Sequence, residues 1–235
     1  MTILYWCEFP EKCDWKKLAS WIKEEKIIIY VTCRSREDYE QKKKKIQNVS
    51  KNIEVNAWPI LSKEEGYWFS AFTNKRSIDT LEQYRGLKIK IDIEPPIPKT
   101  YTLKNAFTWV IINIFKKAKN KKYFQEKIIS LSKDTEIILS TFPLPKWILK
   151  RWGWIEDPKI KYNYMYYSTF IPSGLKWLYK HYYKWHFKTN KEDYIALGLI
   201  GPGIFKKEPI YKDIKEMKED IHFLKNRKEI GRAHV

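Results

Sequence analysis

Short apolar segments alternate with amphipathic segments along the whole chain of 235 residues. Seven of the apolar segments have the length and the β-branched or aromatic content of strands, and each precedes a segment with helical spacing of its apolar residues. No hairpin signal joins two neighbouring strands, so the alternation predicts an α/β protein with a parallel sheet and helical crossovers. The predicted strands are residues 3–9, 26–33, 53–61, 87–94, 135–142, 161–170 and 194–201.

Two architectures fit this alternation, a doubly wound open sheet and a (β/α)8 barrel. No glycine-rich loop follows the first strand, where a dinucleotide-binding sheet needs one. A barrel takes about 250 residues, and an eighth strand would begin just after Lys228. We therefore predict a single-domain (β/α)8 TIM barrel over residues 1–229, truncated after its seventh strand–helix unit.

The last six residues of the chain match a sequence that is known from another source. Ile230–Val235 reads IGRAHV, which is what a common sequencing-library adapter gives when it is translated. The alternative is an ordinary frayed C-terminus. We interpret residues 230–235 as a non-native adapter-derived tail, exclude them from the fold prediction and assign no function to His234.

The chain is strongly basic, with a formal net charge of +18. Such a charge can indicate a nucleic-acid or acidic-membrane partner. However, the lysines are spread along the chain apart from Lys42–Lys45, on a predicted solvated helix face, and they are enriched together with Ile, Asn and Tyr, as in an AT-rich genome. The spread disfavours a nucleic-acid partner, which remains the third of our hypotheses.

The three cysteines, Cys7, Cys13 and Cys33, show no metal-binding spacing, and their number and context favour a reducing compartment. The longest apolar run, residues 107–115, is too short to span a bilayer, and no secretory signal opens the chain. These features predict a cytoplasmic protein without a membrane span.

In a barrel the chemistry lies at the carboxyl ends of the strands, and acids and aromatics gather at those positions here. No HExxH, CxxC, GxSxG or paired-histidine motif is present, so we predict no metal and no cofactor. His181, His186 and His222 fall on predicted helices, where packing roles are expected. The candidate site residues are Glu8, Trp58, Asp92, Glu94, Met165 and Tyr167.

The fourth predicted strand alternates isoleucine with charge and ends at two prolines. Ile89, Ile91 and Ile93 share one face of an extended chain, and Lys90, Asp92 and Glu94 share the other. We expect the isoleucines to face the helices and the charges to point inward. Burial and mutual repulsion would then raise the pKa of the less well paired carboxyl. Because Lys90 favours an ionised Asp92, Glu94 is the better candidate for a general acid.

Each candidate also has a structural interpretation. Lys90 and Asp92 could form a polar network with a neighbouring strand, Glu8 could cap a loop, and Trp58 could be a core residue instead of a platform for a ligand.

Asp92-Ile93-Glu94 at the end of the fourth strand and Met165-Tyr166-Tyr167 at the end of the sixth resemble the family 18 glycoside hydrolases. That family has D-x-x-D-x-D-x-E on strand 4 and M-x-Y-D on strand 6. The resemblance implies that Glu94 protonates a glycosidic oxygen and that Asp92 orients a 2-acetamido group. It also implies that Tyr167 hydrogen-bonds this group and that Met165 lines the pocket.

The sequence departs from the family pattern at three positions. Lys90 stands where the family has its preceding aspartate, Ser168 stands where an acid follows the tyrosine, and Gly86 is not acidic. A lysine in the place of an inner acid also fits a barrel that binds sugar without cleaving it. The leading hypothesis is thus a glycoside-hydrolase-like protein that cleaves an intracellular glycan or sugar conjugate, and the alternative is a non-catalytic carbohydrate- or partner-binding barrel.

Overall fold

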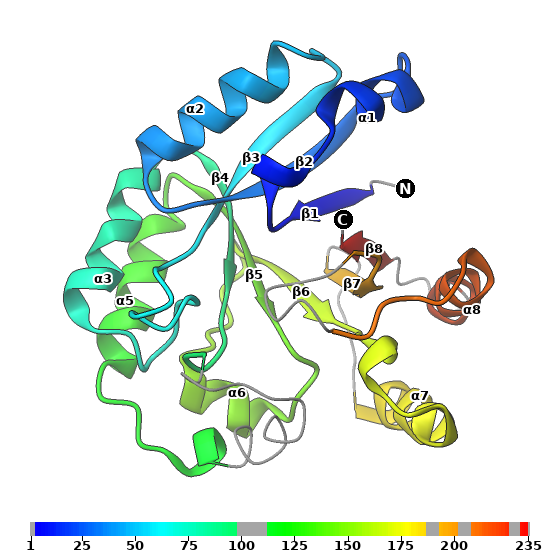
Figure 1. Ribbon diagram of the computed structural model, residues 1–235. Helices are drawn as coiled ribbons and strands as arrows, with labels where there is room; N and C mark the ends of the chain where they lie inside the picture. Colours follow the sequence, from blue (N-terminus) through cyan, green and yellow to red (C-terminus); the bar gives the residue numbers. More distant parts are fainter. Residues whose placement is uncertain (1–2, 98–111, 187–192, 202–207, 226–230, 235) are drawn as a thin grey trace.

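The computed structural model describes residues 3–97, 112–186, 193–201, 208–225 and 231–234 of the chain (Figure 1). The strands are β1 (Leu4–Cys7), β2 (Ile27–Cys33), β3 (Ile53–Pro59), β4 (Lys88–Asp92), β5 (Glu136–Thr141), β6 (Lys161–Met165), β7 (Tyr194–Leu199) and β8 (Gly231–His234). The α-helices are α1 (Trp15–Ile22), α2 (Arg36–Gln47), α3 (Lys75–Asp79), α5 (Lys121–Leu131), α6 (Lys146–Trp152), α7 (Lys176–His186) and α8 (Ile214–Lys225). The 3-10 helices are η1 (Pro10–Lys12), η2 (Thr80–Tyr84), η3 (Ser168–Phe170) and η4 (Ser173–Leu175).

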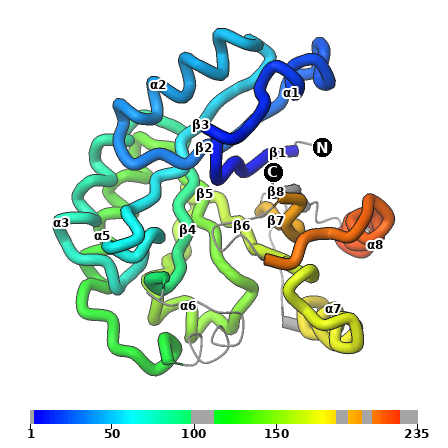
Figure 2. The backbone as a smooth tube through the Cα atoms, viewed as in Figure 1, coloured from blue at the N-terminus to red at the C-terminus, as the bar shows by residue number. Residues whose placement is uncertain are grey.

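All strands run parallel and lie side by side in chain order, so that the sheet curls into a closed ring. The pairing is most extensive between β2 and β3, from Ile27–Ile53 to Cys33–Pro59. Where the ring closes, the pairing found among the described residues of β1 and β8 is that of Trp6 with His234. The backbone trace shows these first and last strands next to each other (Figure 2).

The prediction of an α/β chain with parallel strands is confirmed, and each of the seven predicted strands is present. The prediction of a TIM barrel truncated after its seventh unit is wrong. The sheet does not end at an open β7 edge, because Gly231–His234 pairs with β7 and β1. The physical reason is that an exposed strand edge offers unpaired N–H and C=O groups to any extended segment nearby. The foreign origin of residues 230–235 stays a prediction.

Two apolar clusters lie on opposite faces of the curled sheet. The outer cluster, between the strands and helices, contains Ile89, Ile91 and Ile93 of the β4 segment. The inner cluster contains Trp6, Tyr30, Trp58, Met165 and Tyr167. The predicted orientation of the isoleucines towards the helices is confirmed, and the charged residues between them point to the inner side.

Between β4 and β5, residues 98–111 lie outside the described part, a short helical turn covers residues 112–115, and α5 begins only at Lys121. Directly before it, the backbone N–H of Asn120 donates to the carbonyl of Ala71, and its side-chain amide donates to the carbonyl of Thr73 at 2.9 Å. These hydrogen bonds tie the chain to the loop before α3 and separate α5 from the helical turn that precedes it.

Within the described residues, every helix is too short or too polar to cross a membrane.

Candidate functional site

Strand β4 brings three charged side chains to the inner face of the sheet. Lys90 is 0% exposed, Asp92 3% and Glu94 4%. Lys90 Nζ lies 2.6 Å from Asp92 Oδ1. Beyond the end of β4, the N–H of Ile93 donates to the carbonyl of Ser140, and the hydroxyl of Thr141 donates to the carbonyl of Ile93. The backbone next to Glu94 is therefore held in an extended form.

Two indole rings complete the surroundings of the lysine. The ammonium of Lys90 lies 3.5 Å from the ring centroid of Trp58 and 5.0 Å from that of Trp6. Burial lowers the pKa of Lys90, while the carboxylate of Asp92 raises it. Cation–π attraction also favours the charged form. The ammonium on this strand is thus matched by a carboxylate and two aromatic faces.

The pKa of Glu94 is shifted by its buried position and by its charged neighbours. Burial raises its pKa well above the usual range, and the charge of Asp92 raises it further, whereas Lys90 opposes both effects. Such surroundings favour the protonated form of a carboxyl group. Glu94 therefore holds its proton more firmly than an ordinary glutamate does, next to the ion pair of Lys90 and Asp92.

Glu8 follows β1 directly and is half-buried. Burial raises its pKa to about 7, and the charges of Asp92 and Glu208 contribute. The hydroxyl of Tyr67 donates to Glu8 Oε1 at 3.0 Å and counteracts the rise. Glu8 thus changes its charge near neutral pH, in contrast to the buried Glu94.

Tyr67 was missed by the sequence analysis, and its backbone is unusual. It has φ +67°, a left-handed conformation that is uncommon for a bulky residue. Two hydrogen bonds hold it, from Leu61 N–H to its carbonyl at 2.8 Å and from its own N–H to the carbonyl of Ser62 at 2.9 Å. Such local strain is typical of functional sites. The one signal in the sequence is a glycine directly before two aromatics in the loop after β3.

That glycine also fixes the loop against the end of β4. Gly66 has φ +104°, and a Cβ atom there would lie 2.8 Å from the Cβ of Pro96. Its carbonyl accepts a hydrogen bond from the N–H of Ile97 at 3.1 Å. The loop that carries Tyr67 therefore packs directly on the double proline after Glu94.

The remaining predicted residues lie in the same interior. Met165 and Trp58 are each 2% exposed and belong to the inner cluster with Tyr167. Tyr167 packs edge-on against Phe142 and stacks on Phe170. Burial raises the pKa of Tyr167 well above its usual range, with contributions from the charges of Asp92, Glu94 and Glu8. The structure thus brings all six sequence-predicted residues together.

Trp58 lies beneath the lysine ammonium inside the sheet, so its indole face contacts Lys90. The partly exposed side chains around the inner cluster are Ile28, Trp68, Ile97, Phe142, Phe170 and Tyr194. Trp68 packs edge-on against Tyr67 with ring centroids 5.5 Å apart. The hydrogen bond from Tyr67 thus brings the carboxyl group of Glu8 next to an aromatic pair at the side of the inner cluster.

No group of His, Cys, Asp or Glu in the described part of the chain could hold a metal ion. The polar groups of the interior can instead hold and exchange protons.

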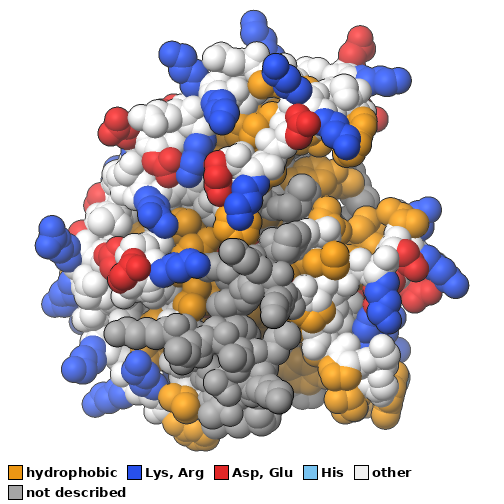
Figure 3. Space-filling model, viewed as in Figure 1, with side chains coloured by type: hydrophobic (Ala, Val, Ile, Leu, Met, Phe, Trp, Pro, Cys, Tyr) orange, Lys and Arg blue, Asp and Glu red, His pale blue; other side chains and the backbone are white. Residues whose placement is uncertain are grey.

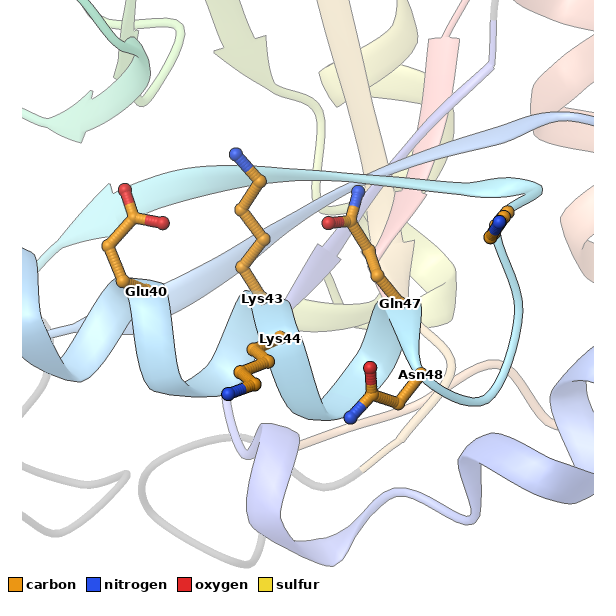
Figure 4. A pocket seen from close by; sticks show the side chains of 6 residues that line it. Glu40, Lys43, Lys44, Gln47 and Asn48 are labelled. Atoms are coloured by element: carbon orange, nitrogen blue, oxygen red, sulfur yellow. The ribbon is translucent and has the colours of Figure 1, made fainter.

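The surface has a different character. Lys and Arg side chains are scattered over the visible face with Asp and Glu between them (Figure 3). An open cleft of about 420 Å³ lies along the outer side of α2, with Glu40, Lys43, Lys44, Gln47, Asn48 and Lys51 around it (Figure 4). Its side chains come from one helix and the turn after it, and none of them belongs to the buried cluster.

Comparison with known proteins places the chain in no family. No family model matches it, and no curated protein matches it. Among solved structures, a short-chain dehydrogenase from Oenococcus oeni PSU-1 is similar at 8% sequence identity and a TM-score of 0.28, over 100% of this chain and 96% of that one. A TM-score this low carries no argument for a shared fold or activity.

The predicted relationship to the family 18 glycoside hydrolases is wrong. No family model and no curated protein supports it. The site gives a physical reason, because Lys90 replaces an inner acid and binds Asp92, the residue that was expected to orient a substrate. The predictions of a glycoside hydrolase, of a carbohydrate-binding barrel and of a glycan ligand are withdrawn with it.

Proposed function

We propose that this protein is an enzyme that transfers protons to and from a small organic substrate, with Glu8 and Glu94 as its acid–base pair. The observation that carries the proposal is the raised pKa of both carboxyl groups in one buried cluster. A general acid or base works best when its pKa lies near the working pH. Pairs of carboxyls whose surroundings separate their pKa values are typical of such sites.

The two acids have different roles in this proposal. Glu8 is the more exposed and has a pKa of about 7, so it can take a proton from a substrate or return it. Glu94 is buried, and burial favours its protonated form. Because the charge of Glu8 raises the pKa of Glu94, deprotonation of one acid strengthens the hold of the other on its proton.

The charges of Lys90 and Asp92 influence the pKa values of both glutamates. Their ion pair is buried and stays within the strand. Asp92 raises the pKa of both glutamates, and Lys90 lowers both. We therefore assign these two residues a positioning role and do not expect them to touch the substrate.

The substrate class follows from the same surroundings. The aromatic and apolar side chains of the inner cluster, with the partly buried Trp68 and Phe142 packed against it, favour a molecule with an apolar face. The carboxylates of Asp92 and Glu8 disfavour an anion, because the ammonium of Lys90 is already paired. We expect a neutral or cationic molecule whose hydroxyl, amino or carbonyl group exchanges the proton.

The three cysteines are free thiols. Because free thiols are typical of reducing compartments, we propose that the protein acts in the cytoplasm.

The test is a turnover screen of the purified protein against neutral and cationic small molecules, followed by mass spectrometry. For any substrate found, Glu8→Gln and Glu94→Gln should each lower kcat/KM by about 100-fold or more. Glu37→Gln, on the exposed face of α2, is the matched control and should leave kcat/KM unchanged. An activity that both glutamine variants at positions 8 and 94 retain in full contradicts the proposal.

A further inference from the structure

Two of the three cysteines are in direct contact at the end of β1. The sulfur atoms of Cys7 and Cys13 lie 3.3 Å apart. Cys7 is buried as the last residue of β1, and Cys13 is half-exposed. A disulfide requires a sulfur–sulfur distance of about 2.05 Å, so the two atoms need to approach by only about 1.3 Å.

The chain between them is folded so that this contact is maintained. The N–H of Lys12 donates to the carbonyl of Phe9 at 2.9 Å, which closes the η1 turn. The indole N–H of Trp15 donates to the carbonyl of Pro10 at 2.9 Å. The thiol of Cys13 also reaches the carbonyl of Phe9 at 3.7 Å. The turn therefore returns Cys13 to Cys7 without help from a disulfide.

The two thiols differ in a way that suits thiol–disulfide exchange. The hydrogen bond with Cys7 lowers the pKa of Cys13, and burial together with the same hydrogen bond raises the pKa of Cys7. Cys13 directly precedes Asp14, the N-cap of α1, and a helix N-terminus favours a thiolate. The more exposed sulfur is thus the one that ionises first, and the buried sulfur lies behind it.

We propose that Cys7 and Cys13 form a reversible dithiol–disulfide centre that a small-molecule disulfide, such as oxidised glutathione, oxidises. The thiolate of Cys13 attacks one sulfur of the small disulfide, whose S–S bond breaks and releases one thiolate. Cys7 then loses its proton and attacks Sγ of Cys13, and the second thiolate leaves. Two protein thiols are oxidised, one small disulfide is reduced to two thiols, and these take up the two protons.

The modification would act on the segment that carries Glu8. Cys7 directly precedes Glu8, and the carbonyl of Glu8 accepts a hydrogen bond from the hydroxyl of Thr32 at 2.8 Å. A covalent link from Cys7 to Cys13 therefore fixes the backbone on both sides of Glu8. The proposal concerns the thiols and stands independently of the acid–base function. Transient disulfides of this kind are the usual form in reducing compartments.

The sequence makes the product easy to detect. Trypsin cuts after Lys12, so a disulfide links two separate peptides, Met1–Lys12 and Cys13–Lys16. The reduced full-length protein is incubated with oxidised glutathione, unfolded in acid, alkylated and digested without reduction. We expect the linked peptide pair, the loss of two of three alkylatable thiols, alkylated Cys33, and full reversal by dithiothreitol.

Cys33 provides the matched control, because it is fully buried and burial raises its pKa to about 12. Cys33→Ala should leave formation of the linked peptides unchanged, whereas Cys13→Ser should abolish them and leave Cys7 alkylated. A stable glutathione adduct on Cys13 without the link, or three alkylatable thiols after oxidation, overturns the proposal. Both outcomes can be recorded on the wild-type chain even if a variant does not fold.

Discussion

Two regions of this protein bury carboxyl groups almost equally well, but the groups that surround these carboxyls differ. Asp220 of α8 is 3% exposed, close to the 4% of Glu94. Asp220 Oδ2 accepts hydrogen bonds from the hydroxyls of Ser168 and Tyr211, the latter at 2.8 Å. The Tyr211 oxygen in turn accepts from the N–H of Gly198 at 3.1 Å. Two hydroxyl groups thus donate to this carboxylate, the ammonium of Lys180 lies 3.9 Å from its Oδ1, and these contacts fasten α8 to the sheet.

The central cluster places carboxyl groups next to other carboxyl groups. The charges of Asp92 and Glu8 raise the pKa of Glu94, and those of Asp92 and Glu208 raise the pKa of Glu8. Such an arrangement reduces the stability of the folded state, whereas hydroxyl donors around Asp220 increase it. The comparison shows that burial of a carboxyl group alone does not indicate a functional site. Buried carboxyl groups that shift one another's pKa values do indicate one.

The largest expected effect comes from Lys90→Met, which leaves Asp92 buried without its cation. We expect a loss of about 3–5 kcal/mol in the free energy of unfolding, measured by urea denaturation at pH 8. Replacing both partners, Lys90→Met with Asp92→Leu, should recover most of the loss.

Lys88→Met is the matched control on the same strand, where the side chain is 48% exposed and paired with Glu54. It should change the unfolding free energy by less than about 1 kcal/mol. A Lys90→Met protein as stable as wild type would contradict the ion pair at the centre of the cluster.

The second largest effect is expected for Asp220, the buried carboxylate of α8 outside the central cluster. Asp220→Ala removes the acceptor of two buried hydroxyls and should cost about 2–4 kcal/mol of unfolding free energy. Once a substrate is known, kcat/KM per folded molecule should be unchanged. Glu219→Ala, exposed on the same helix, serves as the control. A loss of turnover larger than the loss of folded protein would show that Asp220 belongs to the site.

A smaller effect appears as a pH dependence. The pKa of Glu8 rises from 4.5 to about 7 on folding, so the folded state binds more protons than the unfolded state between these values. Stability therefore decreases as pH rises through this window. With allowance for its partial exposure, we expect Glu8 to contribute about 2 kcal/mol to the decrease.

Glu8→Gln should remove this contribution when unfolding free energies at pH 5 and pH 8 are compared. Glu11→Gln, exposed three residues later, should leave the wild-type slope. Equal slopes in wild type and Glu8→Gln would mean that Glu8 has an ordinary pKa.

The smallest effect concerns Tyr67, whose hydroxyl donates to Glu8. Tyr67→Phe removes a hydrogen bond that favours the ionised acid, so the pKa of Glu8 should rise further, as measured by carboxyl NMR titration. Tyr123→Phe removes a hydroxyl that donates to Asp79 outside the cluster and should leave Glu8 unaffected. A fall in the pKa of Glu8 in Tyr67→Phe would contradict the assigned donor.

The alternation of apolar and polar residues predicted more of the structure than the short sequence motifs did. Alternation along Ile89–Glu94 was enough to place isoleucines outside and charges inside, because side chains on a strand alternate faces. The order of the strand–helix units predicted the parallel sheet. An eighth strand was expected just after Lys228, but Gly231–His234 has no hydrophobic pattern and was assigned to a foreign tail instead of to that strand.

The motifs misled because D-x-E and M-x-Y are short and do not specify a partner. The position that separates this site from the glycoside hydrolases is Lys90, and its pairing with Asp92 and Trp58 is a tertiary contact. Tyr67 was missed for a related reason. Its role depends on a left-handed backbone after Gly66 and on a partner 59 residues away, and neither has a periodic signature.

The central claim is that the surroundings raise the pKa of both Glu8 and Glu94 above the ordinary glutamate value, and carboxyl NMR tests it most directly. The protein is labelled with ¹³C at the glutamate carboxyl carbons, the two signals are assigned with Glu8→Gln and Glu94→Gln, and both are followed from pH 4 to pH 9. We predict that Glu8 titrates at about pH 7 and that Glu94 remains protonated at that pH. Titration of both groups near the ordinary glutamate value of about 4.3 would contradict the account.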